Sequence, residues 1–289
     1  MRRNKLSFTK EQKQLLKSRL TRVFLKSYDE KYVINKIEGA NNITELEQIV
    51  MSNDICDYCS FAGLHLEVAK ILICGATRVL YLFPRIRSRM CFLGSVSGYR
   101  NTMRSLCLLD RDIIEKFKIR DICSDDTIIN LASRTLIFID NTEYDNSDAN
   151  ITAEAYPVHG IFDAVVLDEG DFKGLAYRRL LNSLKYSHAT GHHPVGCDSV
   201  ISTVYHEFGH LLDFLIKLSD NEEFLSYYNS FTKEQIEKNL SKYAATNAKE
   251  FFAEAFSEYM SNKKPRSIAT YLWNLLEKLY QEKYKKGEK

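Results

Sequence analysis

Two histidines and a glutamate stand at a spacing that suits metal-dependent hydrolysis. His206, Glu207 and His210 form a His-Glu-x-x-His motif inside the amphipathic run 203–213. On a helix, residues four positions apart lie one turn above each other, so both imidazoles would point from one face toward a single metal ion. Glu207 is rotated by about 100° from His206 and could reach a water on the metal without being a ligand. The motif predicts a zinc site with Glu207 as general base.

A catalytic zinc ion takes three protein ligands and keeps a fourth position for water. A downstream helix is expected to present Glu250 and Glu254 on one face, because they also lie four positions apart. Either carboxylate could be the third ligand. A histidine ten positions after His206 would indicate a metzincin, but Ile216 occupies that position.

Other metal-binding residue types lie close to the motif. Asp213 shares the face of the two histidines but lies one turn further along the helix, so we expect it to fix a neighbouring backbone or side chain. Because three ligands already fill a catalytic site, we expect the preceding loop to shape the cleft, and contact of its side chains with the metal stays open. This loop, residues 187–199, contains His188, His192, His193 and Cys197.

Hydrophobic spacing and capping residues predict the helices that surround the motif. Asp198 or Ser199 would cap the motif helix, and Thr246 or Asn247 the helix with Glu250. Leu46, Ile49 and Val50 would be the buried face of a helix capped by Thr44, with Glu47 completing a capping box. Further helices are expected over 7–32, over 63–83 up to Pro84, within 100–119, and through 220–240.

Three short apolar runs predict strands, at 90–96, 134–140 and 161–167. A sheet of three or more strands together with these helices gives an α+β fold. The strand 161–167, which ends at Asp168 and Glu169, could be an edge along which an extended peptide adds as a further strand. The chain divides into an N-terminal helical region, 1–85, and a larger domain, 86–289, that contains the motif.

Composition restricts the class of protein. The chain has 289 residues, 45% hydrophobic and 27% charged, and a formal net charge of +2, which argues against a dedicated nucleic-acid binder. No signal peptide is visible, and charges interrupt the most apolar window, 64–83, so no membrane span is expected. Seven scattered cysteines, with Cys56-x-x-Cys59 as the one C-x-x-C pair, indicate reduced thiols and a cytoplasmic setting.

The motif and the downstream helix together resemble the catalytic core of the anthrax lethal factor type of zinc metallopeptidase, a gluzincin branch. The resemblance lies in His206-Glu207-Phe208-Gly209-His210 and in Tyr243 followed by 250–256, and it covers roughly residues 160–262. It implies a zincin-like fold with a small mixed sheet, an active-site helix and C-terminal helices. It implies one zinc ion held by His206, His210 and Glu250, with Glu207 as base, Tyr243 as transition-state hydrogen-bond donor and Glu254 orienting a ligand histidine.

A second, more limited resemblance links the chain to minor head proteins of phages and prophages of Gram-positive bacteria. It lies in Pro194-Val195-Gly196-Cys197-Asp198, Phe83-Pro84 and Phe92-Leu93-Gly94. It implies a mobile-element origin, a cytoplasmic or virion setting and phage-particle or prophage-encoded partners.

The sequence therefore predicts a zinc-dependent endopeptidase that acts on a peptide or protein substrate. Zinc would polarise the water and the scissile carbonyl, Glu207 would move the proton to the leaving amine, and Tyr243 would hold the oxyanion. The alternative is a phage structural protein that keeps a zincin-like fold without relevant proteolysis.

Overall fold

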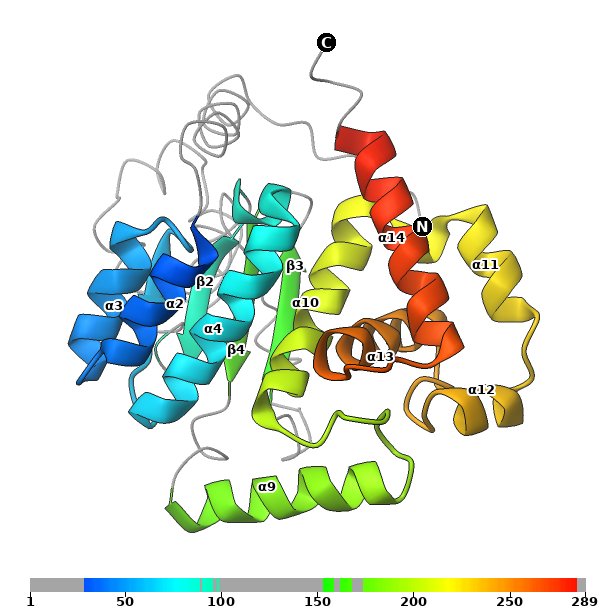
Figure 1. The fold of residues 1–289 in the computed structure, drawn as a ribbon, viewed down its shortest axis with the longest axis horizontal. Helices are drawn as coiled ribbons and strands as arrows, with labels where there is room; N and C mark the ends of the chain where they lie inside the picture. Colours follow the sequence, from blue (N-terminus) through cyan, green and yellow to red (C-terminus); the bar gives the residue numbers. More distant parts are fainter. Residues whose placement is uncertain are drawn as a thin grey trace, which may run out of the picture.

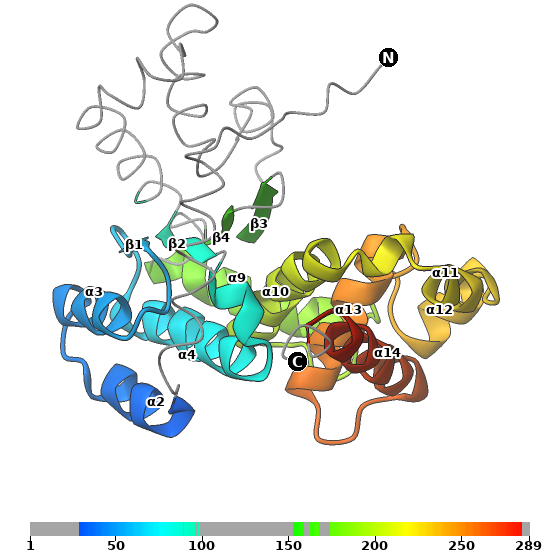
Figure 2. The same cartoon turned by 90° about the horizontal axis from the view of Figure 1, so that it is seen from above.

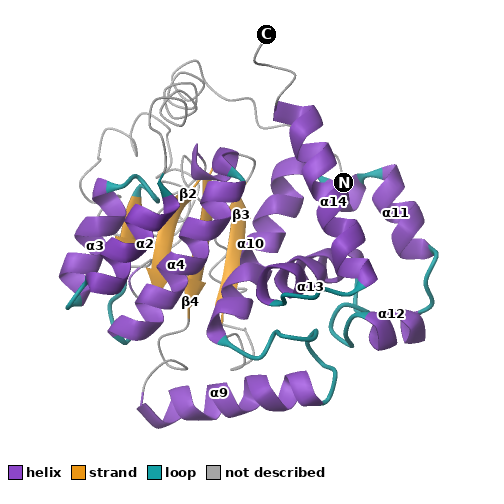
Figure 3. Ribbon diagram, in the orientation of Figure 1, coloured by secondary structure: helices purple, strands orange, loops and turns teal. Residues whose placement is uncertain are grey.

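The computed structural model describes residues 29–88, 90–95, 98, 153–158, 162–167 and 174–284. Over these residues helices outweigh strands, and the strands form one small mixed sheet (Figures 1 and 3). This agrees with the α+β class expected from the sequence. The helices are α2 (Glu30–Gly39), α3 (Ile43–Ser52), α4 (Leu66–Leu82), α9 (Gly174–Ala189), α10 (Val200–Ile216), α11 (Glu222–Asn229), α12 (Lys233–Asn239), α13 (Ala248–Ser261) and α14 (Ser267–Tyr284), with 3-10 turns η1 (Pro84–Ser88) and η2 (Leu218–Asp220). The strands are β1 (Tyr58–Ser60), β2 (Met90–Ser95), β3 (Ala153–Val158) and β4 (Phe162–Leu167).

The described strands pair in the order β1-β2-β4-β3. β1, β2 and β4 run parallel to one another, and β3 runs antiparallel to β4. Leu93 of β2 pairs with Val165 of β4, and both side chains are fully buried. The strands predicted at 90–96 and 161–167 are thus confirmed as β2 and β4.

The prediction that 161–167 is an edge strand is wrong, because β4 pairs with β2 on one side and with β3 on the other. The sequence also did not reveal β1 and β3. β1 is too short to show an alternating pattern, and Pro157 in β3, which lacks an N–H, argues against a strand. The strand expected at 134–140, the helix within 100–119 and residues 7–28 of the first helix lie outside the described residues.

α4 and α10 lie side by side on one face of the sheet (Figure 2). α4 ends before Pro84 as predicted, because proline has no N–H for the helix ladder. Arg78 of α4 donates a hydrogen bond to the hydroxyl of the buried Tyr205 of α10 at 3.1 Å, which ties the two helices together. None of the described helices combines the length and the apolar character needed to cross a membrane.

The N-terminal helices α2 and α3 pack beside α4. α3 begins after Asn42, whose side chain accepts a hydrogen bond from the backbone N–H of Glu45 at 2.9 Å, so the cap predicted at Thr44 is wrong by two residues. Leu46 and Val50 are buried as predicted, whereas Ile49 is only half-buried. An amide oxygen two residues earlier satisfies the helix N-terminus as well as a threonine would, so the capping-box pattern did not decide the start.

One hydrophobic cluster contains buried side chains from both sides of residue 85, from Val33 of α2 to Tyr280 of α14. Phe83 at the end of α4 packs against Trp273 and Tyr280 of α14, with ring centroids 5.5 and 5.1 Å apart. The described helices before residue 86 therefore share a core with the helices that follow the motif.

The C-terminal half of the described chain is helical, and α11 and α12 confirm the charged helices predicted through 220–240. The turn between α13 and α14 is fixed by an ion pair between a half-buried arginine and a buried glutamate. Arg266 Nη2 lies 2.6 Å from Oε2 of the fully buried Glu258, and its Nε donates to the same carboxylate. This pair anchors the end of α13, which is the helix that packs along α10.

α10 and α13 cross at Gly209 and Ala253. A Cβ atom at Gly209 would lie 2.9 Å from Cα of Ala253, closer than such atoms pack. The absence of a side chain at this position sets how near the two helices come to each other.

We expect Gly209→Ala to lower the free energy of unfolding by about 1–3 kcal/mol, since the added methyl group meets backbone that cannot move aside. Gly39→Ala is the matched control, because a Cβ there meets nothing within 4 Å. Urea denaturation of both variants measures the difference. Equal stability of the two variants would contradict the close crossing.

Candidate metal site

The motif histidines project from the middle of α10, as the sequence predicts. The helix begins after Ser199, one of the two expected caps, whose N–H donates to Oγ of Ser202 at 3.3 Å. Nε2 of His206 lies 3.1 Å from Nε2 of His210, so both rings direct the same nitrogen to one point. This is the spacing expected of residues one helical turn apart.

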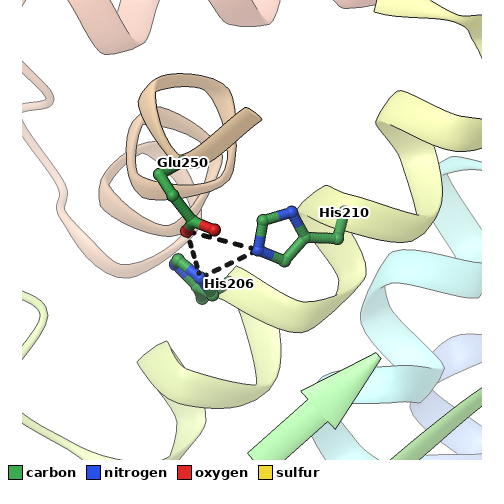
Figure 4. A group of neighbouring side chains, drawn as sticks. All are labelled: His206, His210 and Glu250. Atoms are coloured by element: carbon green, nitrogen blue, oxygen red, sulfur yellow. Dashed lines mark hydrogen bonds and ion pairs between the residues drawn. The ribbon is translucent and has the colours of Figure 1, made fainter. Parts of the chain in front are cut away.

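Glu250 completes a group of three from α13. Asn247, one of the two predicted caps, accepts hydrogen bonds from the N–H groups of Lys249 and Glu250, which places Glu250 in the first turn. Its Oε2 lies 3.1 Å from Nε2 of His206 and 3.4 Å from Nε2 of His210 (Figure 4). Of the two carboxylates that the residue pattern left open, Glu250 is the one that joins the histidines.

The three atoms have the separations that a metal ion would impose. A tetrahedral ion with bonds of about 2.0–2.2 Å holds its ligand atoms about 3.3–3.6 Å apart, close to what is seen here. Oε2 of Glu250 is buried and makes no hydrogen bond, although both imidazoles lie at ion-pair distance. A cation between the three side chains would satisfy this orphaned oxygen, so the residues fit a metal ion, as the cluster His206, His210 and Glu250 indicates.

The site is electrostatically prepared for a cation. Burial acts against ionisation of Glu250 and Glu254, but the neighbouring imidazoles outweigh it and lower the pKa of each carboxyl group to about 2. Burial likewise acts against a charge on His206, but the two carboxylates outweigh it and raise the pKa of that imidazole well above its ordinary value. The negative charge of Glu250 therefore faces the point where the three ligand atoms meet, and that of Glu254 lies on the far side of His206.

Glu254 lies behind the site and contacts the far side of His206. Its Oε1 is 2.9 Å from Nδ1 of His206, and its Oε2 accepts a hydrogen bond from Oγ of Ser241 at 2.8 Å. Because an ionised carboxylate can only accept, the His206 proton is favoured on Nδ1, which leaves the Nε2 lone pair for a metal. Glu254 therefore has the geometry of a residue that orients a ligand.

Glu207 and Tyr243 lie near His206, since the charge of Glu207 raises the pKa of both His206 and Tyr243. The Glu207 side chain is largely buried, 8% exposed, and follows His206 on α10. The Tyr243 ring lies 5.8 Å from the His206 ring, at an interplanar angle of 30°. Burial and the charges of Glu250, Glu207 and Glu254 raise the pKa of Tyr243 to about 12, so its phenol stays a hydrogen-bond donor at neutral pH.

The other side chains near the motif that are of metal-binding types contact protein groups outside the ligand cluster. Burial raises the pKa of the Cys197 thiol to about 12, and its Sγ lies 3.3 Å from Oγ of Ser257. Among the described residues, the ligand cluster does not include any of His188, His192, His193 or Cys197. Asp213 is buried and accepts a hydrogen bond from the N–H of Ser219 at 2.6 Å, which confirms that it fixes a neighbouring backbone.

Two contacts of Glu254 could not be predicted from the sequence. Ser241 is fully buried and links Glu254 to the backbone N–H of Ala244. His193 places Nδ1 at 3.3 Å from Oε1 of Glu254. Each is far from Glu254 in the chain or on a different element, so the spacing of residues along the sequence does not predict the contact.

We expect the protein to bind one metal ion per chain, and His206→Ala or Glu250→Gln to weaken binding by more than about 100-fold. Removal of outer residues around metal ligands already costs about 10–100-fold. Elemental analysis and chelator competition measure the effect. His65→Ala, a change at an exposed histidine at the start of α4, is the control and should bind metal normally. Normal binding by His206→Ala would exclude this site.

Metal affinity should rise with pH. Glu250 and Glu254 stay ionised above about pH 2, whereas a proton must leave His206 before its Nε2 can bind a metal. Below the His206 pKa, each unit of falling pH should weaken binding about tenfold for the one displaced proton. Chelator competition between pH 6 and 8 tests this, and an affinity independent of pH would contradict it.

Comparison of the chain with protein-family models, with curated proteins and with solved structures finds no match.

Proposed function

We propose that the protein is a zinc-dependent endopeptidase with a zincin-like fold of the lethal factor type. The observation that carries the proposal is the convergence of His206, His210 and Glu250, with separations of 3.1 to 3.4 Å between their ligand atoms. Two imidazoles and one carboxylate are a ligand set of catalytic zinc ions. The zincin-like fold is supported by the packing of the histidine-bearing α10 against a mixed sheet, with the third ligand on a later helix.

The surrounding side chains have the properties that peptide hydrolysis needs. A zinc ion bound here would supply a Lewis acid for the scissile carbonyl. Glu207 would take a proton from the attacking water and deliver it to the leaving amine. Tyr243 would donate a hydrogen bond from its protonated phenol to the developing oxyanion, and Glu254 would hold the ring of His206 in place.

The sheet offers a place for an extended substrate. β3 packs against α10 and is the last strand in the described part of the sheet on that side. We propose that a peptide extends along β3, which takes the role first expected of 161–167. Backbone hydrogen bonds to such a strand would hold the peptide independently of its side chains.

Glu207→Gln should retain zinc and lower peptide cleavage by about 10²–10⁴-fold, since the amide cannot accept the water's proton. Tyr243→Phe should lower kcat by about 10²-fold, because one oxyanion donor is lost. A peptide-library cleavage assay and metal analysis on the same samples measure both effects. Glu222→Gln and Tyr186→Phe, changes at exposed residues of α11 and α9, are the matched controls.

Stoichiometric zinc without cleavage that depends on Glu207 would reject the endopeptidase and favour the phage structural protein. Absence of zinc from the wild-type protein would reject both. Cleavage that survives in Glu207→Gln at the wild-type rate would show that another residue is the base.

A further inference from the structure

Side chains from three separate segments meet at Glu254. Its carboxylate is 2% exposed and lies against Nδ1 of His206 on α10, Oγ of Ser241 and Nδ1 of His193. The His193 nitrogen is 3.3 Å from one carboxylate oxygen and 3.4 Å from the other. His193 belongs to the stretch 190–199 between α9 and α10, which we call the α9–α10 loop. One buried anion thus joins the loop to the metal site.

The direction of the His193 contact follows from charge. A carboxylate can only accept hydrogen bonds, as Glu254 does from Oγ of Ser241, so Nδ1 of His193 must carry the proton that it shares. Glu254 thus faces Nδ1 of both imidazoles, at hydrogen-bond distance from His193 and at ion-pair distance, 2.9 Å, from His206. An amide nitrogen at the position of Nδ1 could make the same contact, whereas a methyl group could not.

The same loop also holds the backbone around Tyr243. The N–H of Lys242 donates to the carbonyl of Gly191 at 2.9 Å, and the N–H of Tyr243 donates to the carbonyl of His192 at 3.1 Å. The His193 ring meets the Tyr243 ring at 5.9 Å and an angle of 80°. The loop therefore contacts both the residue that orients His206 and the phenol beside it.

We propose that His193 is a positioning residue that fixes the α9–α10 loop to Glu254 and thereby holds His206 and Tyr243 in register. The neighbouring His192 provides the contrast. It is exposed and its ring lies 5.6 Å from that of Tyr243, but its backbone, not its side chain, holds the loop. The part of the proposal that concerns Tyr243 rests on the proposed peptidase function, and the part that concerns His206 requires only the metal site.

Zinc affinity by chelator competition and the visible spectrum of the cobalt(II)-substituted protein test the proposal, with thermal unfolding as a check of the fold. His193→Ala should weaken zinc binding about tenfold, which is the lower end of the loss in affinity seen when residues behind metal ligands are removed. It should also alter the cobalt spectrum. His193→Asn should restore both, since its amide nitrogen can replace Nδ1. His192→Ala should keep the zinc affinity of the wild type. In a cleavage assay, His193→Ala should lower kcat about tenfold while KM is unchanged, because a displaced phenol affects the reaction and not substrate binding.

Wild-type zinc affinity and an unchanged cobalt spectrum in His193→Ala would overturn the proposal. Equal losses of zinc affinity in His193→Ala and His193→Asn would overturn it too. They would show that zinc binding requires the imidazole ring and not the contact with Glu254. A wild-type protein that binds no zinc would reject the peptidase and this proposal together. Zinc binding that depends on the His193 contact, in a protein that cleaves no peptide, would reject the peptidase and support the positioning of His206.

Discussion

The crossing of α10 and α13 is the constraint on which the rest of the site depends. The helices meet where Gly209 faces the backbone of Ala253. His206 and His210 stand three positions before and one position after Gly209, and the two site glutamates of α13 hold the same two positions around Ala253. Positions spaced by four share one helical face, so each helix presents one pair of side chains beside the crossing. A single interhelical distance therefore sets the separation of all four groups.

This geometry places charges where the interior would ordinarily exclude them. The side chains of His206, His210 and Glu250 are 12%, 20% and 16% exposed, and Glu254 is more deeply buried. Two carboxylates this close to each other need positive charge nearby, which protonated imidazole supplies in the absence of a cation. A bound metal would replace that proton and would also satisfy Oε2 of Glu250. Metal binding should therefore add to the stability of the fold.

The sequence was sufficient for the parts of the site that lie within one helix. A spacing of four defines a face, so the pairing of His206 with His210 and the shared face of Glu250 and Glu254 could be read from the chain alone. The residue pattern did not choose between the two glutamates, because that choice depends on how α13 crosses α10. The resemblance to lethal factor-type peptidases named Glu250, and the geometry agrees with it.

Contacts between distant segments could not be predicted. His193 and Ser241 meet at Glu254 because three segments fold together there, and no local pattern reports such a meeting. The sheet shows the same limit. The apolar residues of β2 predicted that strand. The short β1 and the proline-containing β3 form strands because they pair with neighbouring strands, which their own sequences do not show.

Tyr243 differs from the other groups of the site because no helix holds it. It lies on the turn between α12 and α13, where Ser241 bonds both to Glu254 and to the N–H of Ala244. A phenol on a turn would ordinarily be positioned less precisely than ligands on packed helices. Here the turn is tied to the same carboxylate that faces Nδ1 of His206. The phenol on the turn and the imidazole on α10 are therefore both positioned by Glu254, and a displacement of Glu254 would move both together.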